Sequence, residues 1–175
     1  MFFKNVFLHQ TIRKMNKTII RPLTPSDDEA LAVVVRDVLI EMGVPKVGTA
    51  YEDKALDCMY ETYNQNRMQY FVVVEDDQII GGAGIAPLAE ANRTICELQK
   101  MYFSPKARGR GLGSEMMKVC LDFAKEQDYT HCYLETLPYM EAARKLYKRT
   151  GFEPLKAAMG NTGHYSCSMW MLKEL

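Results

Sequence analysis

Three glycines alternate with larger residues in the stretch ARGRGLGSEMM, directly ahead of a helical pattern. Gly109, Gly111 and Gly113 allow the main chain to pass close to a ligand and to adopt positive φ angles. The free N–H groups at the start of a helix bind anions, and the helix dipole strengthens this binding. Arg108 and Arg110 add positive charge beside these glycines. The stretch therefore predicts a phosphate or pyrophosphate site, although a tight strand-to-helix turn without a ligand would use the same glycines.

The spacing of the glycines does not fit two common nucleotide-binding motifs. The dinucleotide fingerprint G-x-G-x-x-G fails at its sixth position, which is Ser114. A P-loop ends in Gly-Lys-Ser or Gly-Lys-Thr, and the sequence has neither here. A nucleotide-binding protein is therefore the less favoured interpretation, and the motif indicates a different kind of anion-binding turn.

Strand and helix patterns alternate on both sides of this turn. Strands are predicted over residues 18–23, in a hairpin over 69–88, over 94–103 with a bulge around Gln99–Met101, over 131–137, and in a final hairpin formed by 152–158 and 164–172. Helices are predicted over 24–43, 51–66, 112–127 and 139–150. Ser26 and Glu29 have the spacing of a capping box at the first helix. This order predicts a single mixed α/β sheet covered by helices.

Length and composition are those of one soluble domain. The chain has 175 residues, and 22 basic residues balance 22 acidic ones, which gives no general attraction to nucleic acid or to an anionic membrane. Its five cysteines are widely spaced, so a disulfide framework and a zinc site are not expected. We interpret them as reduced thiols of a cytoplasmic protein. Residues 1–16 are expected to form a loosely attached extension, and residues 17–175 the domain.

The motif and its flanks together resemble the GNAT superfamily of acyl-CoA-dependent N-acetyltransferases. The family signature R/Q-x-x-G-x-G/A is met by Arg108, Gly111 and Gly113. A strand like ELQKMYFSP precedes it and a helix like AARKLYKRTGF follows, and the resemblance covers about residues 18–175. It implies a mixed α+β fold with one twisted, mostly antiparallel sheet, splayed central strands and about four flanking helices.

The resemblance also implies where acetyl-CoA, the co-substrate, would bind. The amides of the glycine turn would hold the pyrophosphate, and the backbone of the bulged strand at Met101 and Phe103 would contact the pantetheine. Ala143 is small enough to leave room for the thiol end. The residues expected to bind the cofactor are Met101, Tyr102, Phe103, Arg108, Gly109, Arg110, Gly111, Leu112, Gly113, Ser114 and Ala143.

Two further residues match catalytic positions of the family. Glu97 lies where some members carry a catalytic glutamate, and it could remove the proton of an amine whose pKa is near ~10. It could equally be a strand carboxylate that orders water. Tyr147 matches the tyrosine that protonates the departing thiolate, or it is a packed aromatic residue. The backbone N–H of Met101 is the expected donor to the oxyanion.

The expected activity is transfer of an acetyl group to a primary amine of a small molecule or a peptide, by direct attack in a ternary complex. The alternative is a non-catalytic acyl-CoA-binding regulatory module on the same fold. Met140 stands where the family often has Asn, and His164 could contact the acceptor or be structural. No metal, nucleic acid or membrane is expected as a partner, and the resemblance permits a homodimer.

Overall fold

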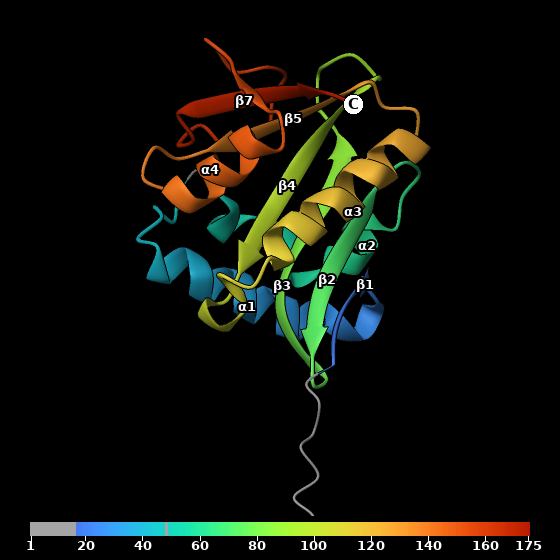
Figure 1. The fold of residues 1–175 in the computed structure, drawn as a ribbon, viewed down its shortest axis with the longest axis vertical. Coiled ribbons are helices and arrows are strands. Elements are labelled where there is room, and N and C mark those ends of the chain that lie inside the picture. Colours follow the sequence, from blue (N-terminus) through green and yellow to red (C-terminus); the bar gives the residue numbers. More distant parts are fainter. Residues whose placement is uncertain (1–16, 48) are drawn as a thin grey trace, which may run out of the picture.

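The computed structural model describes residues 17–47 and 49–175, so the predicted extension 1–16 lies outside the described residues. Its strands form one seven-stranded sheet in the order β1-β2-β3-β4-β5-β7-β6 (Figure 1). They are β1 (Thr18–Pro22), β2 (Gln69–Glu75), β3 (Gln78–Pro87), β4 (Ile95–Phe103), β5 (His131–Thr136), β6 (Glu153–Pro154) and β7 (Met169–Glu174). Among the described residues only β4 and β5 pair in parallel, which confirms the mixed, mostly antiparallel sheet.

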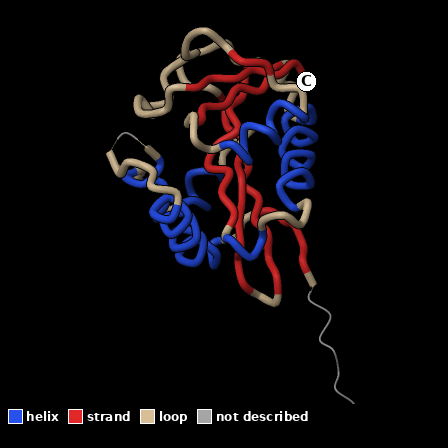
Figure 2. The backbone as a smooth tube through the Cα atoms, turned by 60° about the vertical axis from the view of Figure 1, so that its left-hand side comes forward, coloured by secondary structure: helices blue, strands red, loops and turns tan. Residues whose placement is uncertain are grey.

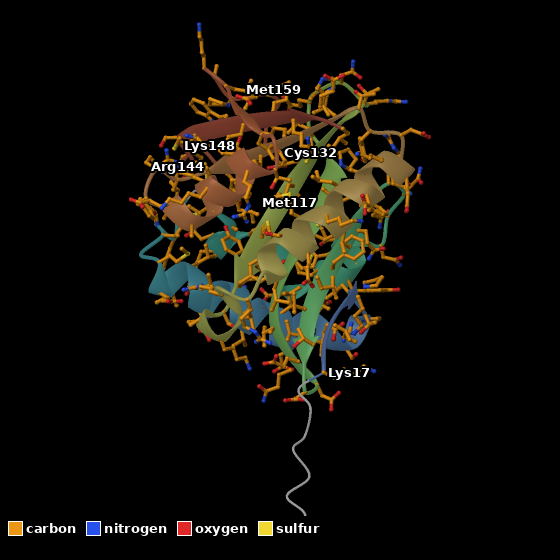
Figure 3. The ribbon with its side chains drawn as sticks, in the orientation of Figure 1. Lys17, Met117, Cys132, Arg144, Lys148 and Met159 are labelled. Carbon is orange, nitrogen blue, oxygen red and sulfur yellow. The ribbon has the colours of Figure 1, made fainter. Side chains whose placement is uncertain are left out.

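Helices cover both faces of this sheet (Figure 2). The α-helices within the described residues are α1 (Asp28–Glu41), α2 (Met59–Tyr63), α3 (Leu112–Glu126) and α4 (Glu141–Arg149). Side chains of β2 alternate between the two faces, so that Val72 packs with α1 and α2 while Val73 packs with α3. Met117 on α3 and Cys132 on β5 belong to the same hydrophobic core as Val73, on the α3 face of the sheet (Figure 3). None of the helices in the described ranges is long and apolar enough to span a membrane.

The centre of the sheet opens where β4 and β5 separate. The two strands pair from Ile95 and His131 only as far as Glu97 and Tyr133. Beyond this point β4 continues beside β3, and its register shifts between Gly82 and Gly84. Lys100 occupies the resulting bulge with φ of 49°. The structure therefore confirms both the bulge and the splayed strands, and it places the bulge at the opening.

Three local predictions were wrong. The capping box is formed by Thr24 and Asp27 in place of Ser26 and Glu29, and it caps the 3-10 turn Pro25–Asp27 that precedes α1. The Asp27 carboxylate accepts hydrogen bonds from the Thr24 N–H (2.8 Å) and hydroxyl (2.7 Å). The late strands are shorter than predicted: only 153–154 and 169–174 are strands, although β6 and β7 do pair as an antiparallel hairpin.

The predicted helix over 51–66 is three short pieces. Two 3-10 turns, Ala50–Glu52 and Lys54–Asp57, precede the short helix α2. The side chain of Asp53 caps the second turn by accepting a hydrogen bond from the Ala55 N–H (3.0 Å), and Cys58 has φ of −144° and ψ of 48°, outside helical values. The apolar spacing in this segment reflects packing of separate turns on the core.

Candidate functional site

A cleft of about 570 Å³ lies at the opening between β4 and β5, and it continues along the glycine turn and one side of α4. Ten of the predicted cofactor-binding residues line it: Met101, Tyr102, Phe103, Arg108, Gly109, Gly111, Leu112, Gly113, Ser114 and Ala143. Arg110 does not line the cleft, because its guanidinium pairs with the Glu75 carboxylate at 2.5 Å and also contacts the Thr18 hydroxyl. The structure thus brings together all of these residues except Arg110.

The glycine turn has the backbone that its sequence predicts. Gly109 and Gly111 have φ angles of 71° and 83°, in the left-handed region that favours glycine. Gly111 is the N-cap of α3, and no side chain caps the helix start. The first amides of a helix have no partner within the helix. Ser114 and Glu115 donate their N–H groups to the Gly111 carbonyl, whereas those of Leu112 and Gly113 have no backbone acceptor among the described residues and remain available to an anion at the end of the cleft.

Two arginines carry charge at this end of the cleft. Arg108 donates both terminal nitrogens to the Glu41 carboxylate, each at 2.8 Å, and its Nε to the Phe103 carbonyl at 2.9 Å. Arg149, at the end of α4, donates to the Ser114 hydroxyl at 2.9 Å. Arg149 was not predicted from the sequence, although it lies in the basic end of the YKRTG segment. The Glu41 carboxylate neutralises the charge of Arg108, whereas Arg149 contacts a neutral hydroxyl. Arg149 therefore has more positive charge available for a ligand.

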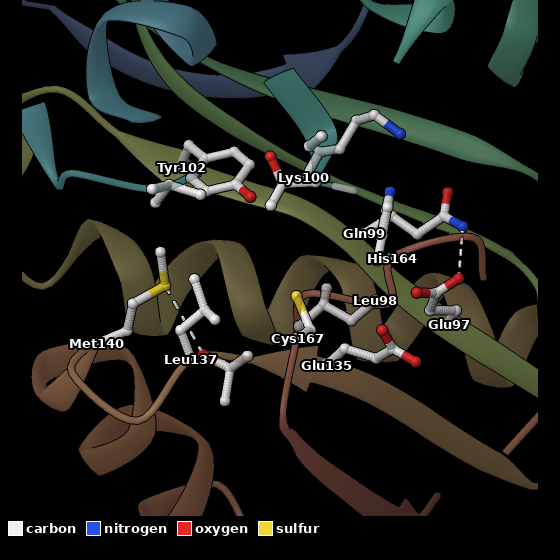
Figure 4. A pocket seen from close by; sticks show the side chains of 14 residues that line it. Glu97, Leu98, Gln99, Lys100, Tyr102, Glu135, Leu137, Met140, His164 and Cys167 are labelled. Carbon is white, nitrogen blue, oxygen red and sulfur yellow. Dashed lines mark hydrogen bonds between the residues drawn. The ribbon is translucent and has the colours of Figure 1, made fainter. Parts of the chain in front are cut away.

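A second, smaller cavity of about 50 Å³ adjoins the cleft (Figure 4). Glu97, Gln99 and His164 line this cavity and do not line the cleft. The residues that line both spaces are Leu98, Lys100, Tyr102, Glu135, Thr136 and Met140. The two predicted catalytic residues therefore lie on either side of this shared boundary, with Glu97 in the cavity and Tyr147 in the cleft.

Glu97 is a buried carboxyl with an unusual ionisation. Only 3% of the residue is exposed, and burial raises its pKa to about 7, with a further increase from Glu135. Gln99 Nε2 donates to Glu97 Oε2 at 2.6 Å, which opposes this increase, and the Tyr63 hydroxyl holds the Gln99 oxygen at 2.6 Å. The Tyr63 ring lies where a Cβ on Gly84 would stand, 2.6 Å away. Glycine in β3 thus permits the chain of contacts that orients Glu97.

The bulge beside Glu97 is held from two directions. The Tyr70 hydroxyl donates to the Lys100 carbonyl at 2.7 Å, and the Lys100 ammonium pairs with Asp53 at 2.5 Å. The Lys100 side chain is only 5% exposed. Tyr70 reaches this position because Gly82 has no side chain, since a Cβ there would lie 2.5 Å from the Tyr70 ring. These contacts offset the cost of a positive φ angle at a lysine, which is about 1–2 kcal/mol.

Tyr147 and Cys167 are protonated groups near the boundary. Tyr147 is 6% exposed, and burial raises the pKa of its phenol. Its hydroxyl forms no hydrogen bond with the residues that the structure describes, and the side chain lines the cleft. Burial also raises the pKa of the Cys167 thiol to about 11. At neutral pH Tyr147 can therefore donate a proton, whereas Cys167 is a poor nucleophile.

Three other residues lie at or near the boundary between the cleft and the cavity: Glu135, Met140 and His164. Glu135 was not predicted, because its position beside Glu97 depends on the pairing of β4 with β5. Met140 contacts the Thr136 hydroxyl through its sulfur at 3.7 Å, and so it borders both spaces in the place of an amide side chain. His164 lines the cavity, and burial lowers its pKa.

Comparison with known proteins agrees with this geometry. Residues 37–152 match the acetyltransferase (GNAT) family. The chain is 41% identical over 158 residues to YjgM of Escherichia coli K12, described as an uncharacterized N-acetyltransferase, and the match covers 90% of this chain and 95% of YjgM. The chain therefore belongs to the GNAT family of N-acetyltransferases.

Solved structures show the same fold at low sequence identity. A GNAT-family acetyltransferase from Staphylococcus aureus Mu50 aligns with a TM-score of 0.77 and 17% identity, over 90% of this chain and 99% of the other. The acetyltransferase yncA from Salmonella typhimurium, solved with acetyl-CoA, aligns with a TM-score of 0.72 and 17% identity, over 90% and 93% of the chains. These matches confirm the predicted fold.

Proposed function

We propose that this protein transfers the acetyl group of acetyl-CoA to the primary amine of a small molecule or peptide, by direct attack in a ternary complex. The observation that supports this most is the continuity of the cleft with the Glu97 cavity. The Glu97 carboxyl, with a pKa of about 7, lies on one side of the shared boundary, and the protonated Tyr147 phenol lies on the other. An amine and a thioester bound in these two spaces would meet at that boundary.

The cleft residues fit the parts of acetyl-CoA. The uncapped start of α3 and the Arg149 guanidinium would bind the pyrophosphate. Met101 and Phe103 on the bulged strand would lie along the pantetheine, and Ala143 leaves space beside them. The related fold of yncA, which binds acetyl-CoA in its crystal structure, supports the same assignment. When bound, acetyl-CoA supplies the activated acetyl group.

The protein's own groups would then handle three changes. Glu97 takes a proton from the ammonium and so frees the nitrogen lone pair for attack. The Met101 N–H donates a hydrogen bond to the acetyl oxygen as negative charge develops there. Tyr147 gives its proton to the departing thiolate. Cys167 is not needed as an acyl carrier, and the raised pKa of its thiol opposes that role.

An acceptor screen tests this proposal. Purified protein with acetyl-CoA and a panel of primary amines should release free CoA thiol with at least one amine, and acetyl-CoA should raise the melting temperature because it binds the folded state. ATP and NAD at the same concentration should have little effect. Stabilisation by acetyl-CoA without thiol release from any amine would favour the regulatory module. Equal stabilisation by ATP or NAD would contradict the cofactor assignment.

A further inference from the structure

The small cavity contains two carboxyl groups on one face of the sheet. Glu97 pairs with Tyr133 across β4 and β5, so the two side chains point to the same face. Glu135 lies two residues further along β5 and therefore shares this face. Figure 4 shows the carboxyl groups of Glu97 and Glu135 directed toward the same space. Glu135 also borders the cleft, so it stands between the cavity and the cleft.

Hydrogen bonds orient both carboxyl groups but leave capacity unused. Gln99 Nε2 donates to Glu97 Oε2 at 2.6 Å, and the Tyr133 hydroxyl donates to Glu135 Oε1 at 2.8 Å. The second oxygen of Glu97, Oε1, accepts no hydrogen bond within residues 17–47 and 49–175, and it points into the cavity (Figure 4). Glu97 is 97% buried, as its 3% exposure shows. Because this oxygen is accessible from the cavity and has free lone pairs, it can accept a hydrogen bond from a ligand.

The cation nearest to these carboxyl groups is already engaged. The positive charge of Lys100 lowers the pKa of Glu97, but Lys100 pairs with Asp53 at 2.5 Å, so its charge is shared with a carboxylate outside this pair. Burial lowers the pKa of His164, which keeps its ring neutral at neutral pH. Neither Glu97 nor Glu135 forms an ion pair with a described residue. The cavity therefore has an excess of negative charge when these groups ionise, and a bound cation would offset the cost of burying them.

The rest of the cavity wall favours an aliphatic chain. Val44, Leu137 and Met140 present apolar side chains to the same space. A ligand with a positive nitrogen and a hydrocarbon stem would match both parts of the wall. A carboxylate close to the nitrogen would instead approach Glu97 and Glu135, and like charges at short range repel.

We propose that Glu135 is a specificity-determining residue that binds the acceptor ammonium together with Glu97, and that the acceptors are aliphatic primary amines without an acidic group beside the nitrogen. This inference rests on the proposed function. Glu135 keeps its negative charge and accepts a hydrogen bond from the nitrogen. Glu97 takes one proton, and the neutral amine stays bound to Glu135 as its lone pair attacks the acetyl carbon. One N–H proton thus moves to Glu97 before attack. Attack then forms the C–N bond and breaks the C–S bond, and the extra proton on the new amide nitrogen replaces the proton that Tyr147 gives to the thiolate.

Binding of propylamine provides the test. Its affinity is measured by calorimetry on the full chain, with and without CoA, for wild type, Glu135→Gln and Glu126→Gln. Glu126 is an exposed carboxyl at the end of α3 and serves as the matched control. A hydrogen bond to a charged group corresponds to about a 10- to 100-fold change in affinity. Glu135→Gln should weaken propylamine by this factor, Glu126→Gln should have no effect, and Glu135→Asp should restore part of the affinity.

Specificity is tested with 3-aminopropanoate, which replaces the terminal methyl of propylamine by a carboxylate. Wild type should bind propylamine more tightly than this amino acid, and Glu135→Gln should reduce the difference. Equal affinities for the two amines, no saturable binding of propylamine, or equal losses in Glu135→Gln and Glu126→Gln would overturn the inference. Failure of wild type to bind CoA would instead contradict the proposed function. The two failures can be told apart because propylamine binding is also measured without CoA.

Discussion

Replacement of Glu97 by Gln should stabilise the protein at neutral and alkaline pH, although it removes the proposed base. The buried carboxyl has a folded-state pKa of about 7, above its ordinary value of 4.5. The folded state therefore binds a proton that the unfolded state releases, and stability falls as pH rises between these two values. Gln has nearly the same shape, can accept the hydrogen bond from Gln99, and does not ionise. The unfolding free energy of the variant should therefore not fall with rising pH through this group.

The size of the effect follows from the two pKa values of Glu97. The rise from 4.5 to about 7 corresponds to about 3 kcal/mol of unfolding free energy, at about 1.4 kcal/mol for each pH unit. Near pH 4.5 the variant and wild type should differ little by this mechanism. Above pH 7 the full difference should appear. For a chain of this length, it equals an increase in melting temperature of about 6–12 °C.

Urea unfolding at several values between about pH 5 and pH 8 measures this difference directly. The gap in unfolding free energy between Glu97→Gln and wild type should widen as pH rises and then become constant above about pH 7. Glu126→Gln, which alters an exposed carboxyl, should show a gap that does not vary with pH. A constant gap for Glu97→Gln, or one that narrows with rising pH, would refute the raised pKa and with it the electrostatic support for Glu97 as the base.

Three further substitutions test separate parts of the site. Tyr147→Phe should lower kcat by about 10²–10⁴-fold and leave the acetyl-CoA dissociation constant nearly unchanged, and an unchanged kcat with chemistry rate-limiting would remove its role as acid. Gly82→Ala should destabilise the fold by about 1–3 kcal/mol in urea unfolding, because the new Cβ would lie 2.5 Å from the Tyr70 ring, and full stability would contradict this packing. Lys100→Met should lower the unfolding free energy by about 2 kcal/mol because Asp53 loses its partner, and it should raise the KM for acetyl-CoA because the bulge loosens. Lys100→Arg should recover both the stability and the KM. An unaltered KM in Lys100→Met would show that the ion pair does not position the bulge.

Features that depend on a few consecutive residues could be predicted from the sequence. The alternate glycines determine the backbone of their turn, and both Gly109 and Gly111 have the positive φ angles that this requires. The broken alternation around Gln99–Met101 likewise predicts the bulge at Lys100. These features place the cleft, and ten of the eleven predicted cofactor-binding residues line it.

Features that depend on partners far apart in the chain could not be predicted. Glu135 faces Glu97 only because β4 and β5 pair in one particular register, which neither strand specifies alone. Arg110 has the charge of a phosphate ligand, but Glu75 on β2 occupies its guanidinium. The segment 51–66 has helical spacing, yet the cap formed by Asp53 divides it into separate turns. In the first two cases a contact across the fold decides the outcome, and local propensity does not contain it. The Asp53 cap is a local contact, but the helical spacing of the apolar residues does not reveal it.

The central claim is that acetyl-CoA binds along the glycine turn, and its dissociation constant in Gly111→Asp tests this most directly. A Cβ at Gly111 meets no atom within 4 Å, so the fold should survive at a cost of about 1–2 kcal/mol for the positive φ. The new carboxylate would stand beside the pyrophosphate and repel it. Gly163→Asp, at a glycine with φ of 77° and equally open surroundings outside the cleft, is the matched control. We predict that Gly111→Asp loses most of its acetyl-CoA affinity while Gly163→Asp retains it. Equal affinity in the two folded variants would place the cofactor elsewhere and contradict the proposed site.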